Sequence, residues 1–443
     1  MMNWFERAIY KQIPLWVFFS ATLPLLLGLF LSAYATYRLD YLRKVSPPVA
    51  SILKGTLSSM DSFALTAKSF VSTGFANTQV EAVQFPVGFY VEDQRAQQGY
   101  FLISAYDVEN SVATVFLYDL KSLELVKEWV PNIRDLLQRV SDSYTPTNED
   151  QPQNFRTQHP ILTNDGGVIF SSGEGLLVKL DQNSDIEWHI ERHFHHSIEH
   201  GLQQNQYISQ IIVTDPVRLP NGNEVQPLRN DGYVVFSDDG EILEERSVAQ
   251  ILIDNGYIGL LFGTSWESDR LHLNDAEYIN YTDNFVRQGD LMLSIRHLST
   301  VLLYRPSQNK VVWLKTGPFL NQHDIDYLGD GKFSIFGNDN VFFGDKRLVY
   351  ESSAVYVYDM ERDVVMRETD LTNADIAINS AGRLQVLSNG NYFIDDTKRA
   401  LLLSPEGKVL LSYSHEAGSS NVGAMHWSRY LADIPKINFE EEE

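Results

Sequence analysis

The sequence predicts an all-β chain: a six-bladed β-propeller preceded by one N-terminal transmembrane helix and a short helical neck. Three observations predict this architecture: an uncharged apolar stretch near the N-terminus, an amphipathic segment after it, and a hairpin pattern that recurs along the rest of the 443 residues. We expect a membrane anchor with its flanks at residues 1–45, the neck or linker at 46–94, the propeller at 95–432 and an acidic tail at 433–443.

The anchor is predicted from residues 12–37, which include no charged side chain. Their apolar core, residues 13–35, exceeds the roughly 20 residues that a helix needs to cross a bilayer. The Ala-Tyr-Ala sequence at 33–35 resembles a signal-peptidase site, but the apolar stretch is longer than a usual signal core, so we expect a retained single-pass anchor. Basic residues lie on both sides of the span, and charge therefore leaves its orientation open.

The neck is predicted as an amphipathic helix at residues 49–72, because the larger apolar side chains there fall on one broad side. Two prolines at 47 and 48 separate this segment from the anchor. The helix could pack on a partner helix or cap the main domain, and the pattern does not choose between the two.

The propeller is predicted from about residue 95 onwards, where runs of β-forming residues alternate with Gly, Asn and Asp turns. A strand, a turn and a second strand recur six times, in the pairs 115–119 with 125–129, 177–181 with 186–188, 232–240 with 241–243, 301–304 with 310–313, 355–359 with 364–366, and 401–407 with 408–413. Because one such unit cannot bury both of its faces, repeated units are expected to pack radially as blades. A long β-sandwich and a seven-bladed propeller are also compatible with the pattern.

Composition restricts the classes of function. With a formal net charge of −23, the chain is a poor candidate for nucleic-acid binding, which requires clustered Lys and Arg. An acidic chain also does not steer anions from a distance, so a sulfate or phosphate site would depend on local groups. The absence of cysteine excludes a disulfide framework, thiolate metal ligands and a cysteine nucleophile.

Polar residues recur in segments that a propeller would bring to one mouth of its central channel. The candidates for catalysis are His196, His272, Asn274, Arg296 and His323. Imidazole, amide and guanidinium groups together suit a small oxyanion with a nucleophile beside it. Two further residues, His195 and Gln322, are candidates for substrate binding, and either His195 or His196 could face the channel. Arg296 could instead tie blades together by ion pairs, and Asn274 could be a turn residue.

These motifs resemble those of the bacterial arylsulfotransferases, or arylsulfate sulfotransferases. The resemblance lies in a His-x-Asn segment at 272–274, a Ser-x-Arg segment at 294–296, a Gln-His-Asp segment at 322–324 and a strand at 330–338 that ends in Asn. It covers residues 100–430, with motif-level strength only between 195 and 340. It implies a six-bladed propeller in the periplasm or extracellular space that moves a sulfuryl group from a phenolic sulfate ester to a phenolic acceptor, without a nucleotide sulfate donor.

The same resemblance implies a role for each candidate. His323 would be the nucleophile that carries the sulfuryl group as a sulfohistidine, while His196, His272, Asn274 and Arg296 would hold the sulfate oxygens and assist the leaving phenol. No cofactor and no metal are expected. The predicted anchor and helix stand where better-known members of the family carry a separate β domain, and the disulfide of those members cannot form without cysteine.

The sequence leaves three alternatives open. Five histidines at 189, 193, 195, 196 and 200 could suggest zinc, but alternating strand geometry puts only some of them on one face. Asp324 and Asp326 could form a glycosidase pair, although no second motif supports one. The propeller could also be catalytically silent and act as an accessory or interaction subunit of a larger membrane assembly, as a homo-oligomer or with partner membrane subunits.

Overall fold

The structure, a computed structural model, describes residues 79–80, 87–108, 111–226, 229–263, 269–343, 346–349, 352–378, 380–416 and 422–435. The predicted membrane span, the predicted neck helix and most of the acidic tail lie outside these residues. Among the described residues, no helix has the length and apolar character needed to cross a membrane. The chain divides into two compact units, 1–73 and 74–443, and all described residues belong to the second.

Four of the large sheets have four or five antiparallel strands each. They are β30-β3-β4-β5 (Arg429–Leu431, Tyr100–Asp107, Val112–Asp119, Glu124–Trp129), β15-β16-β17-β18 (Leu273–Tyr278, Leu291–Ile295, Thr300–Arg305, Lys310–Thr316), β19-β20-β23-β24 (Asp324–Gly329, Lys332–Gly337, Ala354–Asp359, Val364–Asp370) and β2-β28-β27-β26-β25 (Gly88–Val91, Val409–Ser414, Ala400–Leu403, Tyr392–Asp395, Arg383–Val386).

A fifth sheet has seven strands, in the order β14-β13-β10-β9-β8-β7-β6. Their bounds are Ile242–Ser247, Asp231–Ser237, Gln206–Ile212, Ile186–His200, Gly175–Leu180, Val168–Ser171 and Gln158–Leu162. Three two-stranded sheets pair β1 (Gln79–Val80) with β29 (Val422–Gly423), β11 (Val217–Arg218) with β12 (Glu224–Val225), and β21 (Asn340–Phe343) with β22 (Lys346–Val349).

Short helices connect the strands. The α-helices of the described chain are α4 (Ile133–Arg139), α5 (Val248–Asp254) and α6 (Ile258–Phe262), and the 3-10 turns are η2 (Gln94–Ala96), η3 (Arg296–Leu298), η4 (Pro306–Gln308) and η5 (Leu371–Ala374). Helix α5 begins where the Ser247 hydroxyl accepts a hydrogen bond from the backbone N–H of Gln250, the usual way to satisfy a free donor at a helix start.

The six predicted hairpins are all present as antiparallel pairs, which confirms the repeated pattern. They are β4–β5, β8–β9, β13–β14, β17–β18, β23–β24 and β27–β28. The predicted count of six separate blades, however, differs from the sheets that form. The reason is β9, a continuous strand of 15 residues that pairs with β8 near its start and with β10 near its end. This one strand joins two groups of strands into the seven-stranded sheet.

The start of the propeller also lies earlier than predicted. Strand β2 pairs with β28 along Gly88 to Val91, although these residues fall in the stretch expected to be neck or linker. The β-sheet region therefore includes residues ahead of the expected boundary at 95.

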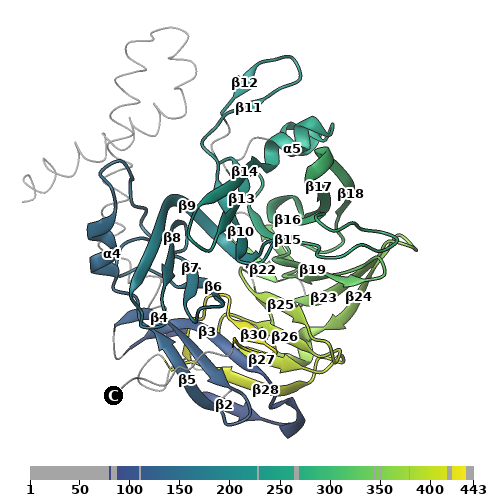
Figure 1. The fold of residues 1–443 in the computed structure, drawn as a ribbon. Helices are drawn as coiled ribbons and strands as arrows, with labels where there is room; N and C mark the ends of the chain where they lie inside the picture. Colours follow the sequence, from purple (N-terminus) through teal and green to yellow (C-terminus); the bar gives the residue numbers. More distant parts are fainter. Residues whose placement is uncertain are drawn as a thin grey trace, which may run out of the picture. The chain divides into compact units, whose positions relative to one another are not determined.

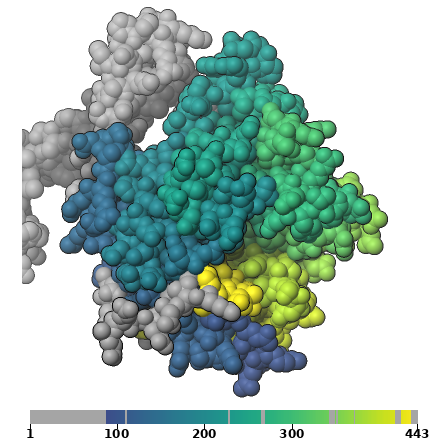
Figure 2. All heavy atoms as spheres, in the orientation of Figure 1, coloured from purple at the N-terminus to yellow at the C-terminus, as the bar shows by residue number. Residues whose placement is uncertain are grey.

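The sheets follow one another around a closed circuit, as a propeller requires (Figure 1). Strand β30, near the end of the chain, pairs with β3, so that Leu431 lies opposite Tyr100. In Figure 2 the yellow C-terminal residues accordingly lie against the purple-blue start of the described chain. Pairing between the first and last sheet segments removes an open edge from the circuit.

The hydrophobic core is divided into wedges between neighbouring groups of strands. One wedge combines Leu102 and Leu117 with Val168 and Val178, from two successive sheets. The seven-stranded sheet contributes a wedge within itself, because Ile169, on β7, and Phe236, on β13, belong to one buried cluster. The two halves of this sheet therefore pack face to face although β9 connects them.

Buried carboxylates tie successive sheets together. The Oδ2 atom of Asp231 accepts the backbone N–H of Leu273 at 2.9 Å, and Oδ2 of Asp275 accepts that of Ile325 at 3.2 Å. The same pattern continues from Asp324 to Leu384 N at 2.7 Å and from Asp395 to Ser428 N at 2.6 Å. Each bond satisfies a buried backbone donor with an acceptor from the preceding sheet.

We expect Asp395→Ala to lower the free energy of unfolding by about 1–3 kcal/mol, because the buried N–H of Ser428 loses its acceptor. Asp395 accepts the backbone N–H groups of both Thr397 and Ser428; Asp395→Asn keeps an oxygen for one of them and serves as the control that removes the titrating group. Burial raises the pKa of Asp395 to about 6 from its ordinary 3.8, so the folded state holds an extra proton between these pH values. The Asn variant should therefore gain stability relative to the parent as pH rises from 4 to 7, measured by urea unfolding. A difference that does not vary with pH would contradict this account.

Candidate functional site

Three predicted histidines come together at one end of the inner strands. The ring centroid of His196 lies 4.8 Å from that of His272 and 6.3 Å from that of His323. They come from three different parts of the circuit: the second half of β9, the residue before β15 and the residue before β19. The sequence segments that suggested a shared site therefore do meet in space.

His196 occupies an irregular point of β9 and turns toward the other imidazoles. Its backbone is left-handed, with φ of 59°, and the register between β9 and β10 shifts beside it. His195 lies behind it, fully buried, with its Nδ1 atom 2.8 Å from Nδ1 of His196. His196 thus adjoins the imidazoles of His272 and His323, and the contact of the fully buried His195 with a substrate stays a prediction.

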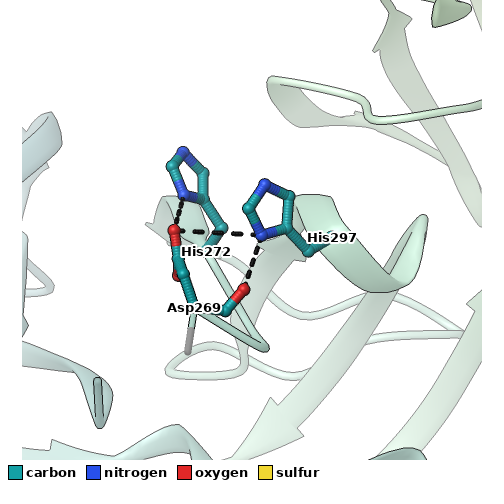
Figure 3. A group of neighbouring side chains, drawn as sticks. All are labelled: Asp269, His272 and His297. Carbon is teal, nitrogen blue, oxygen red and sulfur yellow. Dashed lines mark hydrogen bonds and ion pairs between the residues drawn. The ribbon is translucent and has the colours of Figure 1, made fainter. Parts of the chain in front are cut away.

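His272 is held by a carboxylate that the sequence analysis did not single out. Its Nδ1 atom lies 2.5 Å from Oδ2 of Asp269, and its ring stacks on that of His297 with centroids 4.4 Å apart (Figure 3). Because a carboxylate only accepts, Nδ1 of His272 carries the hydrogen. Its Nε2 atom has no hydrogen-bond partner among the described residues and keeps its lone pair.

Arg296 lies against the same group. The side chain is 1% exposed, its Nη1 atom donates to Nε2 of His297 at 2.9 Å, and its backbone N–H donates to the carbonyl of His272 at 3.2 Å. A guanidinium in this position supplies a fixed positive charge beside the imidazoles. The alternative role of Arg296, tying blades together by ion pairs, stays open beside this one.

Asn274 and Gln322 join two successive sheets. The Nδ2 atom of Asn274 donates to the carbonyl of Gln322 at 2.7 Å, directly before His323, while its Oδ1 atom has no partner in the described structure. The amide nitrogen of Gln322 donates to Ser294 Oγ at 3.1 Å and to the Thr300 carbonyl at 3.0 Å. These contacts tie Gln322 to β16 and β17, and its contact with a substrate stays a prediction.

His323 is fixed at both ring nitrogens. Nδ1 lies 2.5 Å from Oδ1 of Asn338, and the amide of Asn338 in turn donates to the carbonyls of Ile378 and Ala381. This assigns the hydrogen to Nδ1 of His323 and the lone pair to Nε2. That lone pair accepts the backbone N–H of Ala381 at 3.1 Å.

The surroundings of the three imidazoles favour the neutral form. Burial lowers the pKa of His196, His272 and His323 well below the ordinary histidine value. Neighbouring positive groups lower the pKa further: Arg296 acts on His323, and His297 and Arg296 act on His272. A neutral imidazole has the lone pair that a nucleophile needs.

A second group of buried charges lies on strands β9, β25 and β30. Glu199 accepts from Arg383 at 2.9 Å and from Arg429 at 2.9 Å. Burial raises the pKa of Asp324 to about 8 and that of Asp326 to about 7. The glycosidase alternative is not supported by this geometry, because Asp324 spends one oxygen on the backbone of Leu384.

Sequence reasoning missed several residues that touch the site. Asp269 lies three residues before His272, and His297 directly follows Arg296. Their polar side chains next to predicted site residues are the sequence feature that could have identified them. Asn338 was noted only as the end of a motif. Trp427 is half-buried, with its ring centroid 5.8 Å from that of His196, and nothing in the hairpin pattern marks it.

Asp269, His272 and His297 are also close enough together to surround a cation, since one ligand atom of each lies within 4.8 Å of the others. Their nearest nitrogens are already used, because Nδ1 of His297 lies 2.6 Å from the carbonyl of Asp269 and Nδ1 of His272 lies against its carboxylate. Hydrogen bonds therefore account for the arrangement of these three side chains.

Comparison with known proteins gives one family match. A family model described as arylsulfotransferase (ASST) matches residues 156–415. No curated protein matches the sequence closely enough to count as a relative.

Several solved structures are similar at low identity. A protein of unknown function from Bacteroides caccae is 12% identical with a TM-score of 0.41, covering 74% of this chain and 97% of that chain. Hydrazine synthase from Kuenenia stuttgartiensis is 12% identical with a TM-score of 0.42, covering 74% and 78%. The Dos1 propeller is 10% identical with a TM-score of 0.38, covering 75% of each chain.

We expect His196, His272 and His323 to stay neutral when the pH falls from 8 to 6, because burial disfavours the imidazolium. Since an unfolded histidine takes up a proton near pH 6.5, their contribution to stability should be complete above that pH and decline below it. NMR titration of the imidazole signals, assigned by single His→Gln variants, measures this directly. Midpoints at or above 6.5 for these three rings would contradict the assignment.

Proposed function

The chain belongs to the arylsulfotransferase family, and we propose that it transfers a sulfuryl group from a phenolic sulfate ester to a phenolic acceptor through a covalent intermediate on His323. The observation that carries this proposal is the gathering of the His196, His272 and His323 imidazoles, with the buried guanidinium of Arg296 bonded to His297, whose ring stacks on that of His272. This set matches a reaction in which a nucleophile attacks an oxyanion and a phenol leaves.

The first half-reaction begins at Nε2 of His323. Its lone pair forms an N–S bond as the S–O bond to the aryl group breaks, and the phenolate leaves with that electron pair. His272 or His196, neutral before the ester binds, takes up a proton from solvent at its free ring nitrogen when the anionic ester enters, and gives that proton to the phenolate. Nδ1 of His323 keeps its hydrogen and donates it to Oδ1 of Asn338. This hydrogen bond stabilises the positive charge that the ring gains when sulfur is attached.

The second half-reaction reverses these roles. The acceptor phenol gives its proton to the imidazole that lost one, and its oxygen attacks sulfur. The N–S bond breaks, and its electron pair returns to Nε2 of His323. The same residues therefore serve donor and acceptor in turn, and no step requires a nucleotide.

Charge on the sulfuryl oxygens would be met by Arg296 and by the second amide hydrogen of Asn274. As in phosphoryl transfer, negative charge is spread over the oxygens of the group in transit, so fixed donors lower the barrier. Trp427 is half-buried, with its ring centroid 5.8 Å from that of His196 and its ring stacked on that of His159, and we place the aryl ring of the ester against it. Both features support a phenolic ester as the substrate.

We expect His323→Asn to abolish sulfuryl transfer, because no nitrogen with a lone pair remains at that position. The measurement is release of the chromophore from a chromogenic aryl sulfate in the presence of a phenol. His189→Asn is the matched control, since His189 lies in the first half of β9 and pairs with Glu191 away from the site. Retention of full activity in His323→Asn would disprove the role of His323, and thermal unfolding of both variants checks their fold.

The alternative of a silent accessory propeller has one contact in its favour, the Ala381 N–H that occupies the lone pair of His323. In catalysis, Nε2 of His323 would have to release the hydrogen bond from Ala381 before its lone pair could attack sulfur. Absence of turnover by the parent protein across several aryl sulfates and phenols would favour the interaction-module alternative, in which the site holds its blades together and performs no chemistry.

For location, we propose that the segment at residues 13–35 anchors the propeller at a membrane with its site in the periplasm or extracellular space. The absence of cysteine makes a clean test available. In Asp239→Cys, which replaces an exposed residue of a turn, the new thiol should react with a membrane-impermeant maleimide in cells whose outer membrane has been permeabilised. Labelling only after the inner membrane is lysed would place the propeller in the cytoplasm.

A further inference from the structure

We propose that Asp269 is a positioning residue that fixes the tautomers of two imidazoles, His272 through its carboxylate and His297 through its backbone carbonyl. The consequence for catalysis rests on the function proposed above. The structural claim, that one residue decides where two ring hydrogens lie, is independent of it.

The carboxylate defines which nitrogen of His272 serves the reaction. Oδ2 of Asp269 lies 2.5 Å from Nδ1, and a carboxylate accepts without donating, so the ring hydrogen lies on Nδ1. Nε2 is left with the lone pair, and this ring adjoins that of His196 at 4.8 Å. A proton taken from or given to a phenol would therefore pass through Nε2 of His272.

The backbone carbonyl does the same for His297. It lies 2.6 Å from Nδ1, so this nitrogen also carries the hydrogen and Nε2 presents its lone pair. Nη1 of Arg296 donates to that lone pair at 2.9 Å. A guanidinium cannot accept a hydrogen bond, so the other tautomer of His297 would face Arg296 with two opposed hydrogens. The orientation of Arg296 therefore depends on the tautomer that Asp269 selects.

Asp269 is also held by an ion pair with Arg229. Nε of Arg229 lies 3.5 Å from Oδ1 of Asp269 and 2.8 Å from Oδ1 of Asp231. Asp231 accepts the backbone N–H of Leu273, the residue after His272. The bond from Leu273 to Asp231 joins β15 to β13 next to the contact between Asp269 and His272. It therefore restricts the movement of both side chains.

A metal site at the same residues is the rival explanation, because the three groups are close enough to share a cation. In that case Nδ1 of both histidines would point lone pairs, and not hydrogens, toward Asp269. Nδ1 of each ring instead lies directly against an oxygen that can only accept, the carboxylate of Asp269 for His272 and its backbone carbonyl for His297, which requires a hydrogen on each Nδ1. The two explanations therefore differ in the hydrogen positions, which can be measured.

We expect Asp269→Ala to release His272 from its single tautomer while His297, whose acceptor is the backbone, retains its own. Nitrogen NMR of the labelled imidazoles at pH 7.5 measures both rings in one spectrum. Asp269→Asn keeps an acceptor oxygen and should preserve the Nδ1–H form of His272. Asp239→Asn is the control for loss of a carboxylate at an exposed position.

Activity provides the second readout. With a chromogenic aryl sulfate, kcat should fall about 100-fold in Asp269→Ala, the scale of a lost proton-transfer group, and should recover largely in Asp269→Asn. A KM change without a kcat change would contradict the role in proton transfer. If the parent protein has no turnover, the proposed function fails, while the tautomer measurement still decides the role of Asp269.

Two results would overturn the proposal. One is an unchanged Nδ1–H tautomer of His272 in Asp269→Ala, which would show that other contacts select it. The other is stoichiometric binding of added zinc to the parent protein, lost in Asp269→Ala and accompanied by loss of the Nδ1 hydrogens, which would establish a metal site instead. Calorimetric titration with zinc chloride after treatment with a chelator distinguishes this second result from weak surface binding.

Discussion

Buried carboxylates that accept backbone N–H groups across sheet boundaries are the constraint on which the closed circuit depends. Asp231, Asp275, Asp324 and Asp395 each take a donor from the following sheet. Burial raises the pKa of each of these carboxyl groups. Their ionisation is therefore disfavoured in the folded protein, while each supplies an acceptor to a buried backbone N–H. Sheets that also meet through apolar wedges thereby acquire a defined register relative to one another.

The same constraint brings the imidazoles together. Asp231 accepts the N–H of Leu273, directly after His272, and Asp275 accepts the N–H of Ile325, two residues after His323. Each bond fixes the start of an inner strand, so the side chains just before it converge. His196 and His272 add left-handed backbone conformations, which turn their rings out of the regular alternation of a strand. Closure of the sheets and assembly of the site therefore use the same few atoms.

The sequence predicts what is local. All six hairpins follow from runs of β-forming residues and the turns between them. The fusion of two groups of strands through β9 does not follow, because the continuity of a strand across a bulge has no signature in the alternation of residues. Among site residues, His196, His272 and His323 are found by residue type. Ala381 is not, because it contributes a backbone N–H that its side chain does not reveal.

Burial has two opposed effects on the chemistry. It keeps the lone pair on His323, but it also disfavours the imidazolium form of His196 or His272 that the proposed reaction needs to protonate a leaving phenolate. In the proposed reaction an anionic sulfate ester would resolve this conflict, because negative charge beside the rings raises their proton affinity just when a proton is required. A sulfuryl oxygen of the ester would also be a new acceptor for the N–H of Ala381, which now bonds to Nε2 of His323. The charge of the substrate would then both favour protonation of His196 or His272 and release Nε2 of His323 from Ala381. A neutral phenol ester would produce neither effect.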